Sequence, residues 1–247
     1  MISDLTLLFQ TEFEELVFAA HPESVLDVGC GQGGFLRRAT KKGIRAVGID
    51  ANAERVSAVR AAGLEVFHGT AVALPFENGS FDYVVCERSA HHFSDLTVGL
   101  SECFRVARSG VYIFDPWFDE TIPSQTMALQ LERWMKRVDT AQGHVNRGPL
   151  SANDFLHEIP QPGEFEAHIT HRLVLRDAPL SEARMESEAQ LKGWDGAPSF
   201  RTELEQLLSR AATIGLTRPG AIFISFRRKS QDKSSVRTPA LGQVGRV

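Results

Sequence analysis

The sequence contains no apolar run that approaches the roughly 20 residues a transmembrane helix needs. Its only cysteines are Cys30, Cys86 and Cys103, none forms a Cys-x-x-Cys pair, and no His/Cys cluster has zinc spacing. Basic residues (27) do not outnumber acidic ones (31), so the net charge of −4 gives no general attraction for nucleic acid or an anionic membrane. These absences predict a cytoplasmic protein without metal, nucleic-acid or membrane partners.

The first half of the chain alternates short apolar strands with helices. The expected strands are residues 24–29, 44–50, 64–69, 81–87 and 110–115, and the expected helices are residues 4–20, 33–42, 53–63 and 95–108. Strands that alternate with helices of about 10 residues predict βαβ units and a parallel sheet covered on both faces. We therefore expect an α/β fold, Rossmann-like and doubly wound, with a mainly parallel seven-stranded sheet.

The alternation becomes less regular after the fifth strand. Four helices are expected at residues 121–138, 151–159, 181–193 and 199–214, with two further strands at 165–177 and 221–229. We interpret residues 1–229 as one domain, with an α-rich insertion at 116–198 on the substrate side. Residues 230–247 are polar and unpatterned, which predicts a disordered tail.

A glycine-rich turn, Gly29-Cys30-Gly31-Gln32-Gly33-Gly34, separates the first strand from its helix. Glycine permits positive φ and lets a ligand approach the backbone, and the following helix offers free N–H groups. Open α/β sheets bind ligands at the carboxyl ends of their strands. The turn therefore predicts a nucleotide site, with Asp50 placed to bind a ribose. The same glycines match the dinucleotide pattern Gly-x-Gly-x-x-Gly, so a nicotinamide cofactor is an open alternative.

Asp27 lies two residues before the turn, where a dinucleotide-binding strand normally continues apolar. A carboxylate there can hold a cation such as the amine of an amino acid. S-adenosylmethionine has an amino-acid end and NAD does not, so Asp27 favours the former. The alternative is a structural role, in which Asp27 caps the N–H groups of the turn.

Four segments together resemble class I methyltransferases. VLDVGCGQGG (25–34) resembles their motif I, and GID (48–50) resembles the motif whose acid holds the ribose hydroxyls. GTAVALPFENGSFDYVV (69–85) is similar to a segment of the small-molecule "type 11" group, and ERSAHHFSDL (87–96) is similar to the segment after its fourth strand. The resemblance covers roughly residues 24–115 and implies an S-adenosylmethionine-dependent methyltransferase.

The resemblance and the turn together imply a set of cofactor-binding residues. They are Asp27, Gly29, Cys30, Gly31, Gly33, Asp50, Ala51, Thr70, Ala71, Cys86 and Glu87. Thr70 replaces the acid that this group usually directs at the adenine amino group, although a hydroxyl can still accept one hydrogen bond. A second departure is the turn before strand five, which is shortened to Ala107-Arg108-Ser109-Gly110.

Catalytic residues are harder to predict, because the cofactor supplies the reactivity and the protein mainly positions the acceptor. A base is needed only if the acceptor must lose a proton. His91 and His92 follow the fourth strand and are candidates, although either can instead cap the next helix or pack under the cofactor. Arg88, Asp115 and Trp117 are candidate substrate contacts, with core packing as the alternative for Trp117.

The predicted function is methylation of a small-molecule acceptor at oxygen, nitrogen or carbon, by a monomer or homodimer. Two alternatives remain. One is a cofactor-binding protein of the same fold without transferase activity, which a pocket with no room for an acceptor would favour. The other is an NAD-dependent oxidoreductase, against which Asp27 and the LPF…SFD segment argue.

Overall fold

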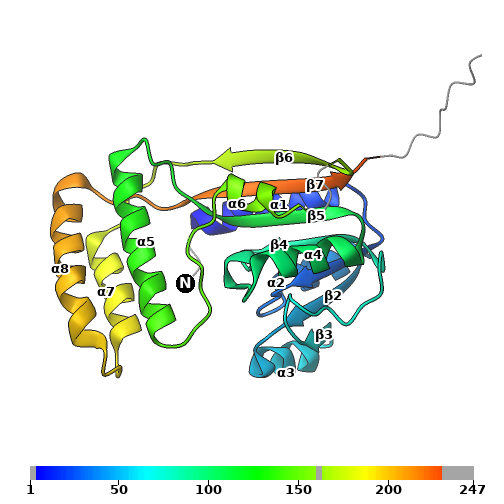
Figure 1. The fold of residues 1–247 in the computed structure, drawn as a ribbon, viewed down its shortest axis with the longest axis horizontal. Coiled ribbons are helices and arrows are strands. Elements are labelled where there is room, and N and C mark those ends of the chain that lie inside the picture. Colours follow the sequence, from blue (N-terminus) through cyan, green and yellow to red (C-terminus); the bar gives the residue numbers. More distant parts are fainter. Residues whose placement is uncertain (1–3, 160–162, 230–247) are drawn as a thin grey trace, which may run out of the picture.

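The computed structural model describes residues 4–159 and 163–229, so the predicted tail at 230–247 lies outside the described residues. It contains a seven-stranded sheet in the order β3-β2-β1-β4-β5-β7-β6 (Figure 1). The strands are β1 (Ser24–Val28), β2 (Arg45–Asp50), β3 (Glu65–His68), β4 (Phe81–Glu87), β5 (Ala107–Trp117), β6 (Phe165–Arg172) and β7 (Gly220–Arg228). Strands β1 to β5 are parallel, and β7 is antiparallel to both of its neighbours. The predicted Rossmann-like, mainly parallel sheet is confirmed.

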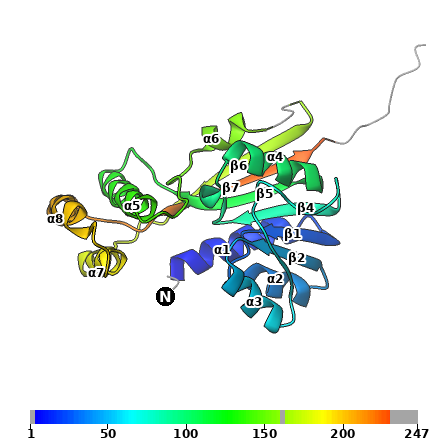
Figure 2. The same ribbon diagram turned by 60° about the horizontal axis from the view of Figure 1, so that its bottom comes forward.

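Helices cover both faces of this sheet (Figure 2). One face carries α1 (Asp4–Phe18), α2 (Gly34–Lys41) and α3 (Ala53–Ala61), and the other carries α4 (Leu96–Val106) and α6 (Ala152–His157). A 3₁₀ turn, η1 (Ala90–His92), links β4 to α4. Apolar residues of β1 alternate between the two cores, because successive strand residues point to opposite faces. No helix within residues 4–159 and 163–229 is long and apolar enough to cross a membrane.

Three helices form a separate bundle beyond one end of the sheet, at the left of Figure 1. They are α5 (Pro123–Ala141), α7 (Leu180–Leu191) and α8 (Ala197–Ile214), and they enclose an apolar core of their own around Trp134. Gln125 connects the bundle to the sheet, because its Nε2 donates to Thr217 Oγ1 and to the carbonyl oxygen of Arg218, both at 2.7 Å. The bundle is therefore fixed beside the carboxyl end of β5.

Two boundaries differ from the sequence predictions. Residues 107–110, predicted as the end of a helix and a short turn, are the start of β5, because Ala107 pairs with Phe81 and Arg108 Nη2 donates to Asp82 Oδ1 at 2.7 Å. Strand β6 ends at Arg172 rather than 177, and only an isolated bridge between Asp177 and Thr217 follows. Strand β6 lies inside the predicted insertion, so that span contributes an edge strand as well as helices. The division into domain and insertion stays a prediction.

Candidate functional site

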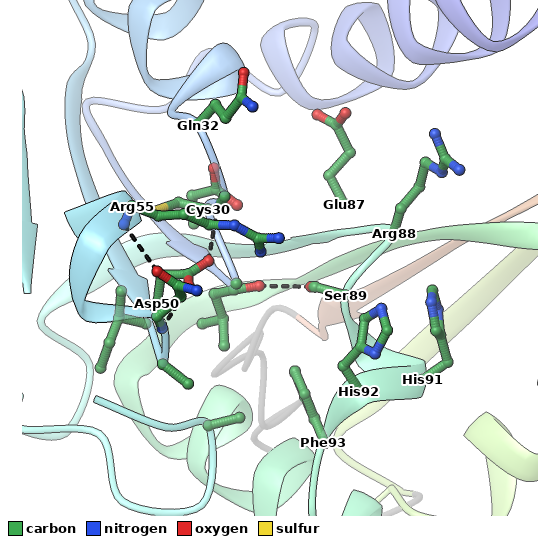
Figure 3. A pocket seen from close by; sticks show the side chains of 18 of the residues that line it. Cys30, Gln32, Asp50, Arg55, Glu87, Arg88, Ser89, His91, His92 and Phe93 are labelled. Carbon is green, nitrogen blue, oxygen red and sulfur yellow. Dashed lines mark hydrogen bonds between the residues drawn. The ribbon is translucent and has the colours of Figure 1, made fainter. Parts of the chain in front are cut away.

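A cavity of about 1180 Å³ lies at the carboxyl ends of β1, β2 and β4 (Figure 3). One wall is the glycine turn between β1 and α2, together with the segment that follows β4. The opposite wall is α5 and the loop that contains residues 144–146. The cavity therefore lies between the sheet and the three-helix bundle, where an open α/β sheet is expected to bind its ligand.

The glycine turn needs glycine at two positions for different reasons. Gly29 has φ of +78°, and a Cβ there would lie 2.5 Å from Ser89 Cβ. Ser89 Oγ donates to the carbonyl oxygen of Val28 at 2.6 Å, so the end of β4 is bonded tightly against the turn. Gly31 also has positive φ, +54°, but a Cβ there would meet nothing within 4 Å. The backbone at Gly31 is thus open to a ligand in the cavity.

Asp50, at the end of β2, is held in place by the backbone of the turn. Its Oδ2 accepts a hydrogen bond from the Gly31 N–H, and its Oδ1 accepts one from the Asn52 N–H, each at 2.8 Å. Each carboxylate oxygen has about two lone pairs, so both retain capacity for a ligand hydroxyl. The sequence prediction placed a ribose-binding acid here, and the geometry suits that role.

Two buried acids lie beside the turn without full hydrogen bonding. Asp27 is only 2% exposed, and its Oδ1 has no hydrogen-bond partner among the described residues. Glu87 Oε2 also has no hydrogen-bond partner among the described residues, although Arg38 Nη2 lies 3.9 Å away. Burial raises the pKa of Asp27 well above its usual range, and burial followed by the nearby Glu14 raises the pKa of Glu87 to about 7. Both acids line the cavity and would be stabilised by a cationic ligand group.

Helix α1 is attached to this acidic corner by polar contacts. Gln10 Nε2 donates to Glu87 Oε1, and Arg38 binds Glu14 through two donors, Nε to Oε2 at 2.6 Å and Nη2 to Oε1. Bidentate arginine–carboxylate pairs fix geometry as well as charge. Helix α1 therefore forms the edge of the cavity, and Gln10 is part of its lining.

A histidine–aspartate pair lies at the cavity wall, where His91 is part of the lining and Asp115 is not. His91 Nδ1 donates to Asp115 Oδ1 at 2.7 Å, and Asp115 is fully buried, with Oδ2 unpartnered among the described residues. In the neutral form of the ring, this arrangement leaves the lone pair on Nε2. His92 lies next to His91, with ring centroids 4.2 Å apart, and its Nδ1 donates to the carbonyl oxygen of Val145 at 3.1 Å. Burial, and then His91, lowers the pKa of His92.

Most of the residues predicted from the sequence come together in this cavity. Those that line it are Asp27, Gly29, Cys30, Gly31, Asp50, Ala51, Thr70, Ala71, Glu87, Arg88, His91 and His92. Four others do not. Gly33 packs against Leu64 and Val59. Cys86 is in the core, with its Sγ 3.9 Å from Cys103 Sγ. Asp115 is buried beneath His91, and the ring of Trp117 packs on His171 with centroids 4.4 Å apart.

The structure adds lining residues that the sequence reasoning missed. On α5, Glu132, Lys136 and Asp139 face the cavity. Their spacing of four and three residues places them on one helix face, but α5 also carries other polar residues, so these three did not stand out in the sequence. Gln10 and Ser89 gave no signal either, because their roles depend on contacts with residues far away in the sequence.

Comparisons with known proteins agree with this geometry. A family described as a methyltransferase domain matches residues 26–114. The chain is 32% identical to the uncharacterized methyltransferase YcgJ of Bacillus subtilis (strain 168) over 133 residues, which are 44% of this chain and 53% of that protein. It is 39% identical to a fatty-acid O-methyltransferase of Mycolicibacterium smegmatis over 95 residues, 36% of this chain and 34% of that protein. The chain thus covers about half or less of these relatives.

The fold is also similar to a solved structure over most of its length. The crystal structure of the YcgJ protein from Bacillus subtilis superposes with a TM-score of 0.61, covering 89% of this chain and 99% of that chain. The sequence identity in that superposition is 19%, so the likeness shows the fold alone.

Proposed function

We propose that this chain, whose residues 26–114 belong to the methyltransferase domain family, binds S-adenosylmethionine and transfers its methyl group to a small-molecule acceptor. The observation that carries the proposal is the pair of buried acids, Asp27 and Glu87, beside the open backbone of Gly31. Class I methyltransferases use S-adenosylmethionine as their methyl donor. That cofactor carries an ammonium group and a sulfonium, both cationic, and suits an acidic corner.

Each part of the cofactor has a matching group in the cavity. Asp27 and Glu87 would hold the ammonium group, because each has a buried oxygen without a hydrogen-bond partner among the described residues. Asp50 would accept hydrogen bonds from the ribose hydroxyls, and Thr70 and Ala71 would lie beside the adenine. NAD fits this arrangement less well, because its diphosphate would face the same two acids.

The proposed chemistry is an in-line displacement, for which the bound cofactor supplies an activated methyl group. The residues of the chain orient the acceptor and exclude water. For a hydroxyl acceptor, His91 Nε2 takes the proton as the oxygen–methyl bond forms. Asp115 orients the ring through Nδ1 and stabilises the imidazolium that results. Asp115 thus acts through His91 and does not touch the acceptor.

The His91–Asp115 pair favours oxygen as the attacked atom, since an amine or an activated carbon has less need of a base. His92 is the second candidate base. Its lowered pKa keeps it neutral at pH 7, but its ring lacks a carboxylate partner.

The size of the cavity favours an enzyme over a protein that only binds the cofactor. Small-molecule pockets usually enclose about 300–1,000 Å³. The cavity here, about 1180 Å³, extends past the glycine turn to α5 and leaves space for an acceptor.

The proposal is tested by incubating the protein with S-adenosylmethionine and a panel of phenols, carboxylic acids, amines and thiols, and measuring S-adenosylhomocysteine by mass spectrometry. We expect acceptor-dependent product from the wild-type protein and from Asp195→Asn, an exposed control. Asp27→Asn should lose the product. Product formation that is unaffected by Asp27→Asn would contradict the proposed cofactor site.

A further inference from the structure

A second cavity of about 850 Å³ lies between the start of α1 and the bundle helices α5 and α7. Apolar side chains form much of its lining, among them Leu5, Phe118, Ala128, Leu131, Met135 and Leu216. It shares Arg88 and Glu132 with the first cavity, so the two spaces adjoin at these residues. Arg88 and Glu132 therefore form the boundary at which a ligand could contact both cavities.

Arg88 is held at this junction in an unusual conformation. Its φ is +53°, in the left-handed region that residues other than glycine rarely adopt. Its N–H donates to the carbonyl oxygen of Phe114 at 2.6 Å, which fixes the backbone. Figure 3 shows the side chain next to Glu87, extending away from His91 and His92. Strain of this kind is concentrated at functional sites.

The guanidinium of Arg88 makes no hydrogen bond or ion pair with the described residues, whereas two acids that line the second cavity do. Glu132, the other shared residue, pairs with Lys136 at 3.1 Å. Within the second cavity, Glu182 pairs with Arg218. The other charged residues that line it, Asp4, Arg176, Asp177 and Glu186, are exposed, as Arg88 is, but only Arg88 also lines the first cavity. At the junction itself Glu132 is already paired, and the charge of Arg88 offsets part of the rise in the pKa of Glu87 without forming an ion pair, so the guanidinium is available to an anionic ligand group.

From this arrangement we infer that the acceptor is an amphipathic anion that spans both cavities. Its anionic group pairs with Arg88, its apolar part occupies the second cavity, and its reacting atom lies in the first cavity near His91. The inference rests on the proposed function and adds a substrate class to it. Arginine suits this role, because its planar guanidinium binds carboxylate and phosphate in a bidentate manner.

The test uses three probes, decanoate, butanoate and 1-decanol, titrated by calorimetry in the presence of S-adenosylhomocysteine. Decanoate should bind more tightly than butanoate, by about fourfold for each methylene that enters the apolar cavity. Arg88→Asn should weaken the binding of decanoate by about tenfold, which corresponds to the loss of one charged hydrogen bond. The affinity for 1-decanol should not change. Asparagine is chosen because it tolerates the left-handed conformation.

Three further variants separate the possible outcomes. Arg88→Lys should retain part of the affinity for decanoate, and Arg133→Asn, an exposed change on α5, should have no effect. Ala183→Trp should fill the second cavity and reduce the affinity for decanoate more than the affinity for butanoate. The inference is wrong if decanoate does not bind or if it binds equally well to Arg88→Asn. It is also wrong if Arg88→Asn reduces the affinity for S-adenosylhomocysteine instead of the affinity for decanoate. Failure of S-adenosylhomocysteine to bind the wild-type protein would overturn the proposed function separately.

Discussion

At the scale of single residues, the site depends on groups whose environments differ from those of ordinary surface side chains. Gly29 and Gly31 both have positive φ, yet one is closed off by Ser89 and the other opens to the cavity. Asp27 and Glu87 are carboxyls in a largely buried corner. Asp115 is fully buried against His91. Each of these environments leads to a measurable consequence.

Gly29→Ala should lower the free energy of unfolding by about 3 kcal/mol, because it combines a left-handed backbone with a steric clash. Its control is Gly63→Ala, at φ +80° and with nothing within 4 Å of the added Cβ, which should cost only about 1 kcal/mol. Urea denaturation measures both values. Equal losses would show that the contact with Ser89 does not constrain the turn.

Binding of S-adenosylhomocysteine at pH 7 should release protons. The pKa of Glu87 is about 7, so about half of these carboxyls are protonated before binding. A cationic ligand group favours the ionised form and lowers that pKa, so the proton leaves. Calorimetry in buffers of low and high ionisation enthalpy measures the number released.

Glu87→Gln should reduce that release by about half a proton at pH 7, whereas the exposed control Glu77→Gln should not change it. At pH 9 Glu87 is already ionised, so the difference between wild type and Glu87→Gln should disappear. Identical proton release by wild type and Glu87→Gln at pH 7 would remove Glu87 from the cofactor site.

Asp115→Asn should lower kcat for a hydroxyl acceptor by about 10²- to 10⁴-fold, the range of general-base catalysis, with little change in KM. The amide no longer fixes the proton on His91 Nδ1 or stabilises the imidazolium. Affinity for S-adenosylhomocysteine should be unchanged, because Asp115 does not line the cavity. A loss of cofactor affinity equal to the loss of kcat would indicate a purely structural role.

At the scale of elements, the first five strands and their helices could be predicted from the sequence because each is a local pattern. Apolar runs mark β1, β2 and β4, and glycines end α2 and α3. The junction of α4 and β5 was predicted less well, since Ala107 has no strand preference and its pairing with Phe81 is a long-range contact. Pairings between distant segments, such as His91 with Asp115 or Gln10 with Glu87, leave no pattern in the sequence.

The bundle of α5, α7 and α8 has its own apolar core, so damage to it should remain local. Trp134 is fully buried there, and its Nε1 donates to the carbonyl oxygen of Phe200 at 3.3 Å. Trp134→Ala should lower the free energy of unfolding by about 3–5 kcal/mol. Hydrogen exchange should show lost protection in α5, α7 and α8 and retained protection in β1, β2 and β4.

The exposed control for this change is Arg133→Ala on the same helix. Because the bundle core contributes no residue to the glycine turn, Trp134→Ala should keep its affinity for S-adenosylhomocysteine. If that affinity is lost together with the protection of β1, the bundle and the sheet unfold as one unit, contrary to our account.

At the scale of the whole molecule, the cavity has two sides that are formed by different parts of the fold. The sheet edge supplies the glycine turn and the acids, and it is the part that matches the methyltransferase family. The bundle supplies the opposite wall, which in our proposal faces the acceptor. The cofactor could therefore be predicted from motifs, whereas the acceptor had to be inferred from the shape and charge of two adjoining cavities. That the protein acts as a monomer or homodimer stays a prediction.

The most direct test of the central claim is calorimetric titration of the protein with S-adenosylmethionine, S-adenosylhomocysteine and NAD, using wild type, Asp27→Asn and the control Asp195→Asn. Our account predicts that the two sulfur compounds bind wild type and Asp195→Asn, that Asp27→Asn binds them at least about tenfold more weakly, and that NAD does not bind. Binding of NAD alone would contradict the account and favour the dinucleotide interpretation of the same glycine turn.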